Sequence, residues 1–168
     1  MPTDIARHLR QTIDRELRNL RSLTEGQSSL KPAGLDAWSP KQELGHLIDS
    51  AANNHIRFVR AAITPESAES PLQFDGYAQD AWVETHSYQD MSWLAIIDFW
   101  SQYNYFLAGL IEQIPSPRLR TNCRVASDPP ATLRFLIEDY VVHMQHHLDH
   151  LLKRPVITIY PQVVPTTI

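Results

Sequence analysis

Hydrophobic residues recur with a helical period in four long stretches of the chain. The first stretch runs from Asp4 to about Leu23, and its charged residues fill the faces that the apolar ones leave free. Intervals of three and four residues bring side chains to one side of a helix. The residues that follow this spacing are Ile5, Leu9, Ile13, Leu17 and Leu20. We therefore expect a first amphipathic helix here.

The second stretch opens with a helix-start signal. Ser39 stands directly before Pro40, and Gln42 follows two residues later, which is the order of an N-cap hydroxyl, a first-turn proline and a capping-box glutamine. The pattern predicts a helix from Pro40 to about Ala62. Its apolar side is made of Leu44, Leu47, Ile48, Ala51, Phe58 and Ala62.

Two more helices are expected, from about Tyr88 to Gln113 and from about Ala131 to Lys153. Prolines after each of them prevent the helix from continuing. The third helix is rich in aromatic residues, and its predicted buried set is Trp93, Ile96, Ile97, Trp100, Phe106, Leu107 and Leu110. Four amphipathic helices with longer connections indicate an all-α fold, a four-helix bundle with long crossover loops.

The connections are predicted from their turn-forming and polar residues. Gly26 to Gly34 forms a loop, and residues 64–73 show neither a helical nor a strand period, which is typical of a surface crossover. Tyr77 and Trp82 flank a predicted short helical turn. These aromatic residues either cover one end of the bundle or line a pocket. A polar loop is expected between the third and fourth helices.

Length and composition favour one domain over residues 1–168, of which residues 155–168 form an extended C-terminal tail. The chain has 168 residues and 43% hydrophobic content, which suffices for one core. The segment from Val156 to Tyr160 is apolar and β-prone. We expect it to lie across the bundle or to pair with a partner chain.

Charge and cysteine content narrow the function classes. The net charge is −4 and no cluster of Lys and Arg occurs, so a nucleic-acid partner is not expected. Cys123 is the single cysteine, which excludes an intrachain disulfide. No apolar run is long enough to be a secretion signal or to span a membrane. These features predict a cytoplasmic protein without a membrane partner.

The histidines are concentrated near the C-terminus. Four of the eight lie between residues 143 and 150, and two pairs have the i, i+4 spacing that directs imidazoles to one point: His143 with His147, and His146 with His150. On a helical wheel the first pair lies roughly 55–95° from the centre of the apolar stripe and the second roughly 115–155°. The first pair borders the core, and we predict it as a ligand pair. Two ligands are half of a metal site, so the spacing alone leaves open that these are ordinary boundary histidines.

The second helix carries one histidine on its polar side. His46 lies roughly 150° from the centre of the apolar face, and it shares its side with Ser50, Asn53 and Arg57. This polar stripe faces either solvent or a groove against another helix. His55 points toward the apolar side instead, as a packed and hydrogen-bonded histidine would.

Taken together, several segments resemble the DinB/YfiT-like family of metal-dependent enzymes. They are the stretch from Trp38 to Leu47, the pair at residues 49–50, the short segment from Tyr77 to Trp82, and the pattern His143-x-x-x-His147. The resemblance implies an up-down-down-up bundle that holds a divalent metal, zinc or nickel, through His46, His143 and His147. Where the family often has a glutamine, three residues after the last ligand, this chain has His150. Its role as a bystander, an extra ligand or a partner of the ligands stays open.

The resemblance also carries expectations about function. Three imidazoles leave a coordination position free, as in catalytic sites, so we expect a metal-dependent enzyme, a thiol S-transferase or a hydrolase, in which the metal activates a thiolate or a water. No catalytic side chain is identified. Arg57 is expected to hold a carboxylate of a low-molecular-weight thiol, and Asp139 to orient His143. The alternative is a non-catalytic metal- or ligand-binding bundle, associated with stress. A homodimer is expected through the third helix and the tail.

Overall fold

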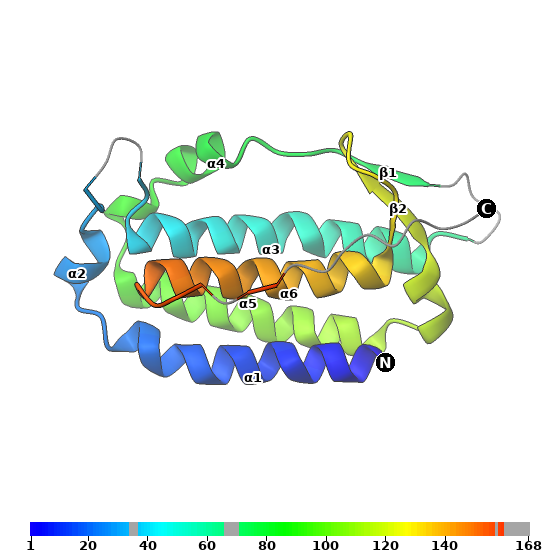
Figure 1. Cartoon of the computed structure of the whole chain (residues 1–168), viewed down its shortest axis with the longest axis horizontal. Helices are drawn as coiled ribbons and strands as arrows, with labels where there is room; N and C mark the ends of the chain where they lie inside the picture. The colour runs from blue at the N-terminus through cyan, green and yellow to red at the C-terminus, as the bar shows by residue number, and fades with distance from the viewer. Residues whose placement is uncertain (34–36, 66–70, 157, 160–168) are drawn as a thin grey trace.

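Four long helices pack side by side in the structure, a computed structural model that describes residues 1–33, 37–65, 71–156, 158 and 159. They are α1 (Pro2–Arg21), α3 (Pro40–Ile63), α5 (Trp93–Gln113) and α6 (Leu133–Leu151). Helices α1 and α6 run in one direction, and α3 and α5 run in the other (Figure 1). The predicted all-α, up-down-down-up four-helix bundle is therefore confirmed.

The two strongest sequence signals are confirmed in detail. In α1, Leu9, Ile13 and Leu20 are fully buried, as their period predicts. At the start of α3, the Ser39 hydroxyl accepts a hydrogen bond from the Gln42 backbone N–H at 3.3 Å, and the Gln42 side-chain oxygen accepts one from the Ser39 N–H at 3.1 Å. This reciprocal pair satisfies two backbone donors of the first turn and fixes where α3 begins.

Other boundaries differ from the expectation. A short helix, α2 (Glu25–Ser29), lies inside the predicted first loop, because Thr24 and Gln27 form a second capping box there. The third bundle helix begins at Trp93 and not near Tyr88, since a separate 3-10 turn, η1 (Tyr88–Asp90), precedes it. Phe106 was predicted to be buried, but its side chain is 56% exposed.

A small sheet joins the two long connections, and the sequence did not predict it. β1 (Leu72–Phe74) pairs in parallel with β2 (Asn122–Val125), which pairs antiparallel with β3 (Ala131–Thr132). The interpretation of residues 64–73 as a crossover without a strand was therefore wrong for the last two residues of that range, which belong to β1. The fourth bundle helix, expected from about Ala131, begins at Leu133, after β3. Strands of two to four residues have no detectable period, and β1 pairs with a segment far away in the chain.

The crossover between α3 and α5 returns along the length of the bundle. It passes from β1 to α4 (Gln79–His86), which lies over the first half of α3 (Figure 1). The predicted helical turn after Tyr77 is confirmed by α4. This return places Tyr77 and Trp82 above α3 at the level of His46 and Asp49, which is where the functional features are found.

The end of α6 is fastened to α1 by a buried ion pair. Arg154, just after α6, donates from both terminal nitrogens to the two carboxylate oxygens of Glu16 at 2.9 Å, and Glu16 is fully buried. Burial alone would raise the pKa of Glu16, but the hydrogen bonds from Arg154, Asn19 and Arg15 outweigh it and lower the pKa to about 2.

The C-terminal tail is only partly described. Of the predicted β-prone segment, residues 157 and 160 lie outside the described residues, and Val156, Thr158 and Ile159 have no regular secondary structure. Within the described part of the chain, no helix combines the length and the apolar character that crossing a bilayer requires.

Gly45 is required by the packing of α3 against η1. A Cβ atom built on Gly45 would stand 2.2 Å from the Tyr88 ring, which is far inside a van der Waals contact. Glycine costs about 1 kcal/mol in a helix relative to alanine, so its presence in the interior of α3 is explained by this close approach. The contact sets the position of Tyr88 beside Asp49.

We expect Gly45→Ala to destabilise the protein despite the better helix propensity of alanine. The added methyl group must displace the buried Tyr88 ring, and overpacking of this kind costs about 1–3 kcal/mol. Urea unfolding measures the loss. Gly109→Ala is the matched control, because nothing lies within 4 Å of a Cβ at that position of α5; this variant should be as stable as the parent or more stable. Equal stabilities for the two variants would contradict the account.

Candidate metal centre

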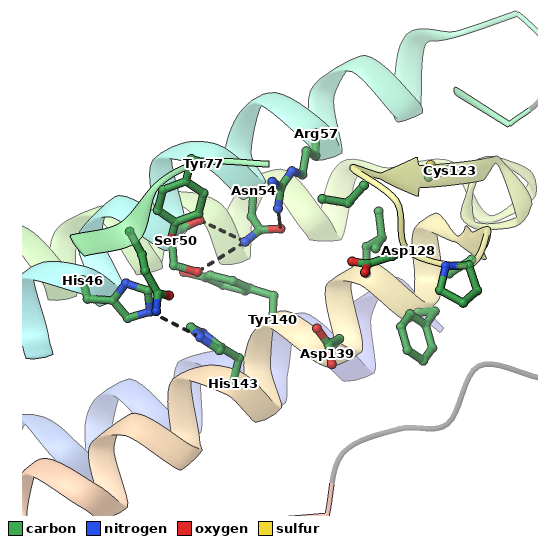
Figure 2. A pocket seen from close by; sticks show the side chains of 16 residues that line it. His46, Ser50, Asn54, Arg57, Tyr77, Cys123, Asp128, Asp139, Tyr140 and His143 are labelled. Carbon is green, nitrogen blue, oxygen red and sulfur yellow. Dashed lines mark hydrogen bonds between the residues drawn. The ribbon is translucent and has the colours of Figure 1, made fainter. Parts of the chain in front are cut away.

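Three histidines from two helices meet between α3 and α6. The Nε2 atom of His143 lies 3.4 Å from Nε2 of His46 and 3.1 Å from Nε2 of His147. One ligand atom from each residue lies within 4.8 Å of the other two. Figure 2 shows His46 and His143 pointing toward each other across the space between their helices. The structure thus brings together the three residues that the family resemblance indicated.

The arrangement fits a small divalent cation. A tetrahedral ion with metal–nitrogen bonds of about 2.0–2.1 Å holds two ligand nitrogens about 3.3 Å apart, close to the two measured separations. The Nδ1 atom of His147 faces a carboxylate and so carries the proton, which leaves its Nε2 lone pair directed at the centre. Imidazole lone pairs that converge in this way repel one another unless a cation lies between them.

Glu43 supports the centre, and the sequence analysis missed it. Its buried carboxylate accepts hydrogen bonds from Nδ1 of His147 at 2.8 Å and from Nδ1 of His150 at 2.9 Å. A carboxylate behind a ligating imidazole fixes the tautomer and makes the ligand more basic. The available signal was an acidic residue three positions before His46, on the helix expected to carry a ligand.

His150 and His146 lie outside the converging group. The His150 side chain is 62% exposed and contacts Glu43, so it stands behind His147 and does not point to the centre. The His146 ring lies 5.6 Å from the ring of His147. His55, predicted to be packed and hydrogen-bonded, lies 3.1 Å from the Tyr103 hydroxyl through Nδ1, as expected.

Burial keeps two of the three imidazoles neutral. Desolvation, followed by the nearby charge of His147, lowers the pKa of His46 to about 4 and that of His143 to about 3. His46 is 1% exposed, although the helical wheel placed it on the outer side of α3. The polar side of α3 faces α6 and the α4 segment rather than solvent, which resolves the difference.

We expect the metal-free protein to lose stability as the pH falls below about 6.5, the pKa of free histidine. In the unfolded chain both imidazoles take up a proton there, whereas in the folded chain they stay neutral to about pH 4 for His46 and about pH 3 for His143. The unfolded state therefore binds more protons in this window. The free energy of unfolding should fall by about 1.4 kcal/mol per pH unit for each proton.

Chemical unfolding of chelator-treated protein at a series of pH values measures this slope. The His143→Gln variant should show a shallower decline, because its side chain does not titrate. An identical slope in the variant and the parent would contradict the assignment of the buried neutral imidazoles.

A cavity of about 410 Å³ opens beside the histidines. His46 and His143 line one part of it, and Ser50, Asn54 and Arg57 continue along α3 (Figure 2). The predicted polar stripe of the second helix thus lines a cavity. Asn54 stands there in the place expected for Asn53. The Asn53 side chain donates a hydrogen bond to the Asp49 backbone carbonyl instead. The cavity connects the metal centre with a charged far end.

Arg57 is the cation at that far end. Its guanidinium donates to the Asp75 carbonyl at 3.1 Å and to the Asn54 side-chain oxygen at 3.5 Å. Burial is the main cause of its lowered pKa, and the charges of Tyr77 and Asp128 oppose the shift. A guanidinium has five N–H donors, so donors remain for an anionic ligand group.

Asp139 lies in the cavity wall one helical turn before His143. Burial, together with the charge of Asp128, raises the pKa of its carboxyl group. Among the described residues it makes no hydrogen bond to His143, so the expected orienting contact is not formed in this structure. Glu43 performs the corresponding role for His147. Asp139 faces the cavity instead, where a carboxyl group with a raised pKa can exchange a proton with a ligand.

Cys123 is present in the cavity wall but is not activated. It lies in β2, is fully buried, and burial raises the pKa of its thiol to about 11. Reactive cysteines have a lowered pKa in an electropositive setting. These surroundings do not favour Cys123 as the nucleophile.

The chain is similar to known proteins in sequence and in fold. Residues 8–151 match the model of the DinB superfamily. YfiT from Bacillus subtilis, described as "a probable metal-dependent hydrolase with an unusual four-helix bundle topology", superposes with a TM-score of 0.72 at 19% identity, over 88% of this chain and 84% of that one. A variant of a mycothiol-dependent maleylpyruvate isomerase superposes with a TM-score of 0.65 at 9% identity, over 94% of this chain.

These likenesses define the fold. The present chain spans 60% of the length of the isomerase, and at these identities neither relative transfers its reaction. No curated protein matches the sequence significantly. Family membership and the residues of the site are therefore the basis for any functional argument.

Proposed function

This chain belongs to the DinB superfamily, and from that membership we propose that it is a metal-dependent enzyme that acts on a small molecule in the cavity beside His46, His143 and His147. The observation that carries the proposal is the convergence of three imidazole nitrogens next to a cavity of about 410 Å³. Zinc or nickel is the proposed metal, since imidazole ligands suit both.

The ligand set favours catalysis over a purely structural role. Structural zinc sites use four protein ligands, whereas catalytic sites use three and keep one position for substrate. Among the described residues, the group of possible ligands contains only the three histidines. The open side of this group faces the cavity lining of Ser50, Tyr77 and Asp139, so a substrate has access to it.

The proposed reaction is transfer of a low-molecular-weight thiol, with hydrolysis as the second candidate. A divalent ion held by the three histidines supplies Lewis acidity, which lowers the pKa of a substrate thiol or water. Because Cys123 is buried with a raised pKa, we propose that the nucleophile, a thiol or water, enters with the substrates and is not supplied by this cysteine. Asp139 is proposed to accept its proton at the carboxylate, and Arg57 to bind a carboxylate of the thiol.

Both candidate reactions have support among the structural relatives. The maleylpyruvate isomerase is described as mycothiol-dependent and YfiT as a probable metal-dependent hydrolase. The position of Arg57 favours the thiol reaction, since its half-buried guanidinium provides a cation at the end away from the metal centre. A ligand that spans the cavity would have its thiol at the histidines and an anionic group at Arg57.

Metal analysis and activity assays test the proposal together. Protein purified without chelator and without nickel resin should contain zinc or nickel at about one ion per chain. Thiol transfer to an electrophilic acceptor, and hydrolysis of small esters and amides, should then be measured for the metal-loaded protein. Arg57→Ala should raise KM for an acidic thiol, with Arg60→Ala, which lies over the Phe74 ring, as the control.

A metal-loaded protein without activity toward thiols, esters or amides would favour the alternative, a non-catalytic metal- or ligand-binding bundle. Its support is that, among the described residues, no imidazole outside the ligand group lines the cavity as a general base. An association with stress belongs to this alternative and has no residue-level support.

We also propose a homodimer. Leu94 and Phe106 on α5 are each more than half exposed, and exposed apolar patches of this kind mark interaction surfaces. Light scattering at micromolar concentration should give twice the chain mass, and Phe106→Asp should reduce it. A monomeric parent protein would contradict the proposal. A dimer that persists after removal of residues 155–168 would place the interface on the helices and not on the tail.

A further inference from the structure

A second cavity lies on another side of α3, away from the metal centre. It is enclosed by α3, α4, η1 and α5, has a volume of about 590 Å³, and shares no lining residue with the cavity beside the histidines. Its walls are almost entirely apolar or aromatic, and they include Ile48, Trp82, Tyr88, Ile96, Phe99 and Tyr103. Ligand pockets in proteins have volumes of about 300–1,000 Å³, so this one has the size of a small-molecule site.

The lining residues with a carboxylate or an imidazole are Asp49 and His86, and Tyr88 and Tyr103 contribute phenolic hydroxyls. The Asp49 carboxylate is 1% exposed. Its Oδ1 atom accepts hydrogen bonds from the Tyr88 hydroxyl at 2.7 Å and from Nδ1 of His86 at 3.0 Å. Its Oδ2 atom is buried and has no hydrogen-bond partner among the described residues.

A carboxylate with one unpartnered oxygen is costly in apolar surroundings. Burial raises the pKa of Asp49, and the hydrogen bonds from Tyr88 and His86 act against that shift. These two donors fix the orientation of the carboxylate at Oδ1 but leave Oδ2 unsatisfied. A positively charged group in the cavity beside the carboxylate would offset this cost.

The walls select for the same charge. Aromatic rings attract cations to their faces, with tryptophan and tyrosine most effective when the cation is desolvated. Trp82, Tyr88, Phe99 and Tyr103 supply such rings around the carboxylate. Among the described residues that line the cavity there is no Lys or Arg, and the His86 imidazole is held by the Asp49 carboxylate. An anionic ligand would be repelled by Asp49.

We propose that this cavity binds a small organic cation, a primary amine with an aromatic or branched hydrocarbon body, whose ammonium group pairs with the Asp49 carboxylate. The hydrocarbon body occupies the space between Trp82, Ile96 and Phe99. The site is independent of the proposed metal-dependent reaction, because none of its residues is a metal ligand or lines the reaction cavity.

Titration of the full-length protein with 2-phenylethylamine tests the proposal, followed by calorimetry and by tryptophan fluorescence. The amine should bind with saturation and quench the emission of Trp82. 2-Phenylethanol, which has nearly the same shape without the charge, should bind about tenfold more weakly or worse. Equal affinities for the amine and the alcohol, or the absence of saturable amine binding, would overturn the proposal.

Variants then locate the site. Asp49→Asn keeps the shape and removes the charge, so amine affinity should fall about ten- to hundredfold. The control Asp90→Asn removes the same charge from η1 outside the cavity lining and should leave the affinity within about twofold. Because Asp49→Asn also affects packing, Ala95→Trp provides a second route: it fills the cavity from α5 without touching the carboxylate and should abolish binding. Retained binding in either Asp49→Asn or Ala95→Trp would exclude this cavity as the amine site.

Discussion

Replacing His46, His143 or His147 by alanine is expected to weaken divalent-metal binding more than about hundredfold. Each residue supplies one of the three converging nitrogens, and even residues that only support a ligand change metal affinity about 10–100-fold. Loss of one ligand leaves two imidazoles, which is half of a tetrahedral site. Competition with a chromogenic chelator measures the affinity of each variant.

The same substitutions should remove the stabilisation that metal gives to the folded state. A ligand that binds only the native protein stabilises it by about 2.7 kcal/mol at a hundred times its dissociation constant. For a domain of this size that corresponds to roughly 5–10 °C in Tm. The parent protein should show this increase on addition of metal, and the three variants should not.

Two histidines serve as controls for this experiment. His8→Ala and His146→Ala should retain metal binding, because neither residue belongs to the converging group. If His146→Ala abolished binding while His143→Ala preserved it, the choice of histidines on α6 would be wrong. Normal binding by His46→Ala would remove α3 from the site and, with it, the case for a three-histidine centre.

The sequence predicts the bundle because its information is local and periodic. Leu9 and Ile13 on α1, and the capping box at Ser39, lie where the pattern places them. The sheet was missed for the opposite reason: Leu72 pairs with Cys123, and no local pattern connects segments so far apart. His46 is buried because the polar side of α3 faces α6. The spacing of the apolar residues in α3 does not show which other helix lies against its polar side.

The supporting residues were harder to predict than the converging ones. Histidines stand out by their number and spacing, whereas Glu43 is one of many acidic residues, and its role depends on the approach of α6 to the first turn of α3. Asp139 had the same helical offset from His143 that an orienting carboxylate would have, yet it turns toward the cavity. Sequence spacing limits which residues share a face of one helix, but contacts between two helices depend on their packing.

Glu43→Gln is expected to lower metal affinity about 10–100-fold. The Glu43 carboxylate accepts from Nδ1 of both His147 and His150. A glutamine has one acceptor oxygen and an NH₂ group that only donates, so it can satisfy one imidazole and opposes the other. Loss of the negative charge also makes the His147 ring a weaker base. His147 remains in place but is less well oriented and binds the metal less strongly.

Measurements on the metal-free protein distinguish this orienting role from a structural one. Glu43 is 4% exposed, and burying a neutral amide costs less than burying a carboxylate. The Tm of the metal-free Glu43→Gln variant should therefore stay close to that of the parent while its metal affinity falls.

His150→Ala should have the smaller effect on metal affinity, because Glu43 then still accepts a hydrogen bond from His147. Glu138→Gln, an exposed carboxylate on α6 that pairs with Arg134, is the charge-matched control and should change neither quantity. A Glu43→Gln affinity within about twofold of the parent would show that the carboxylate does not orient His147; a parallel loss of Tm in the metal-free state would assign Glu43 to the packing of α3 against α6 instead.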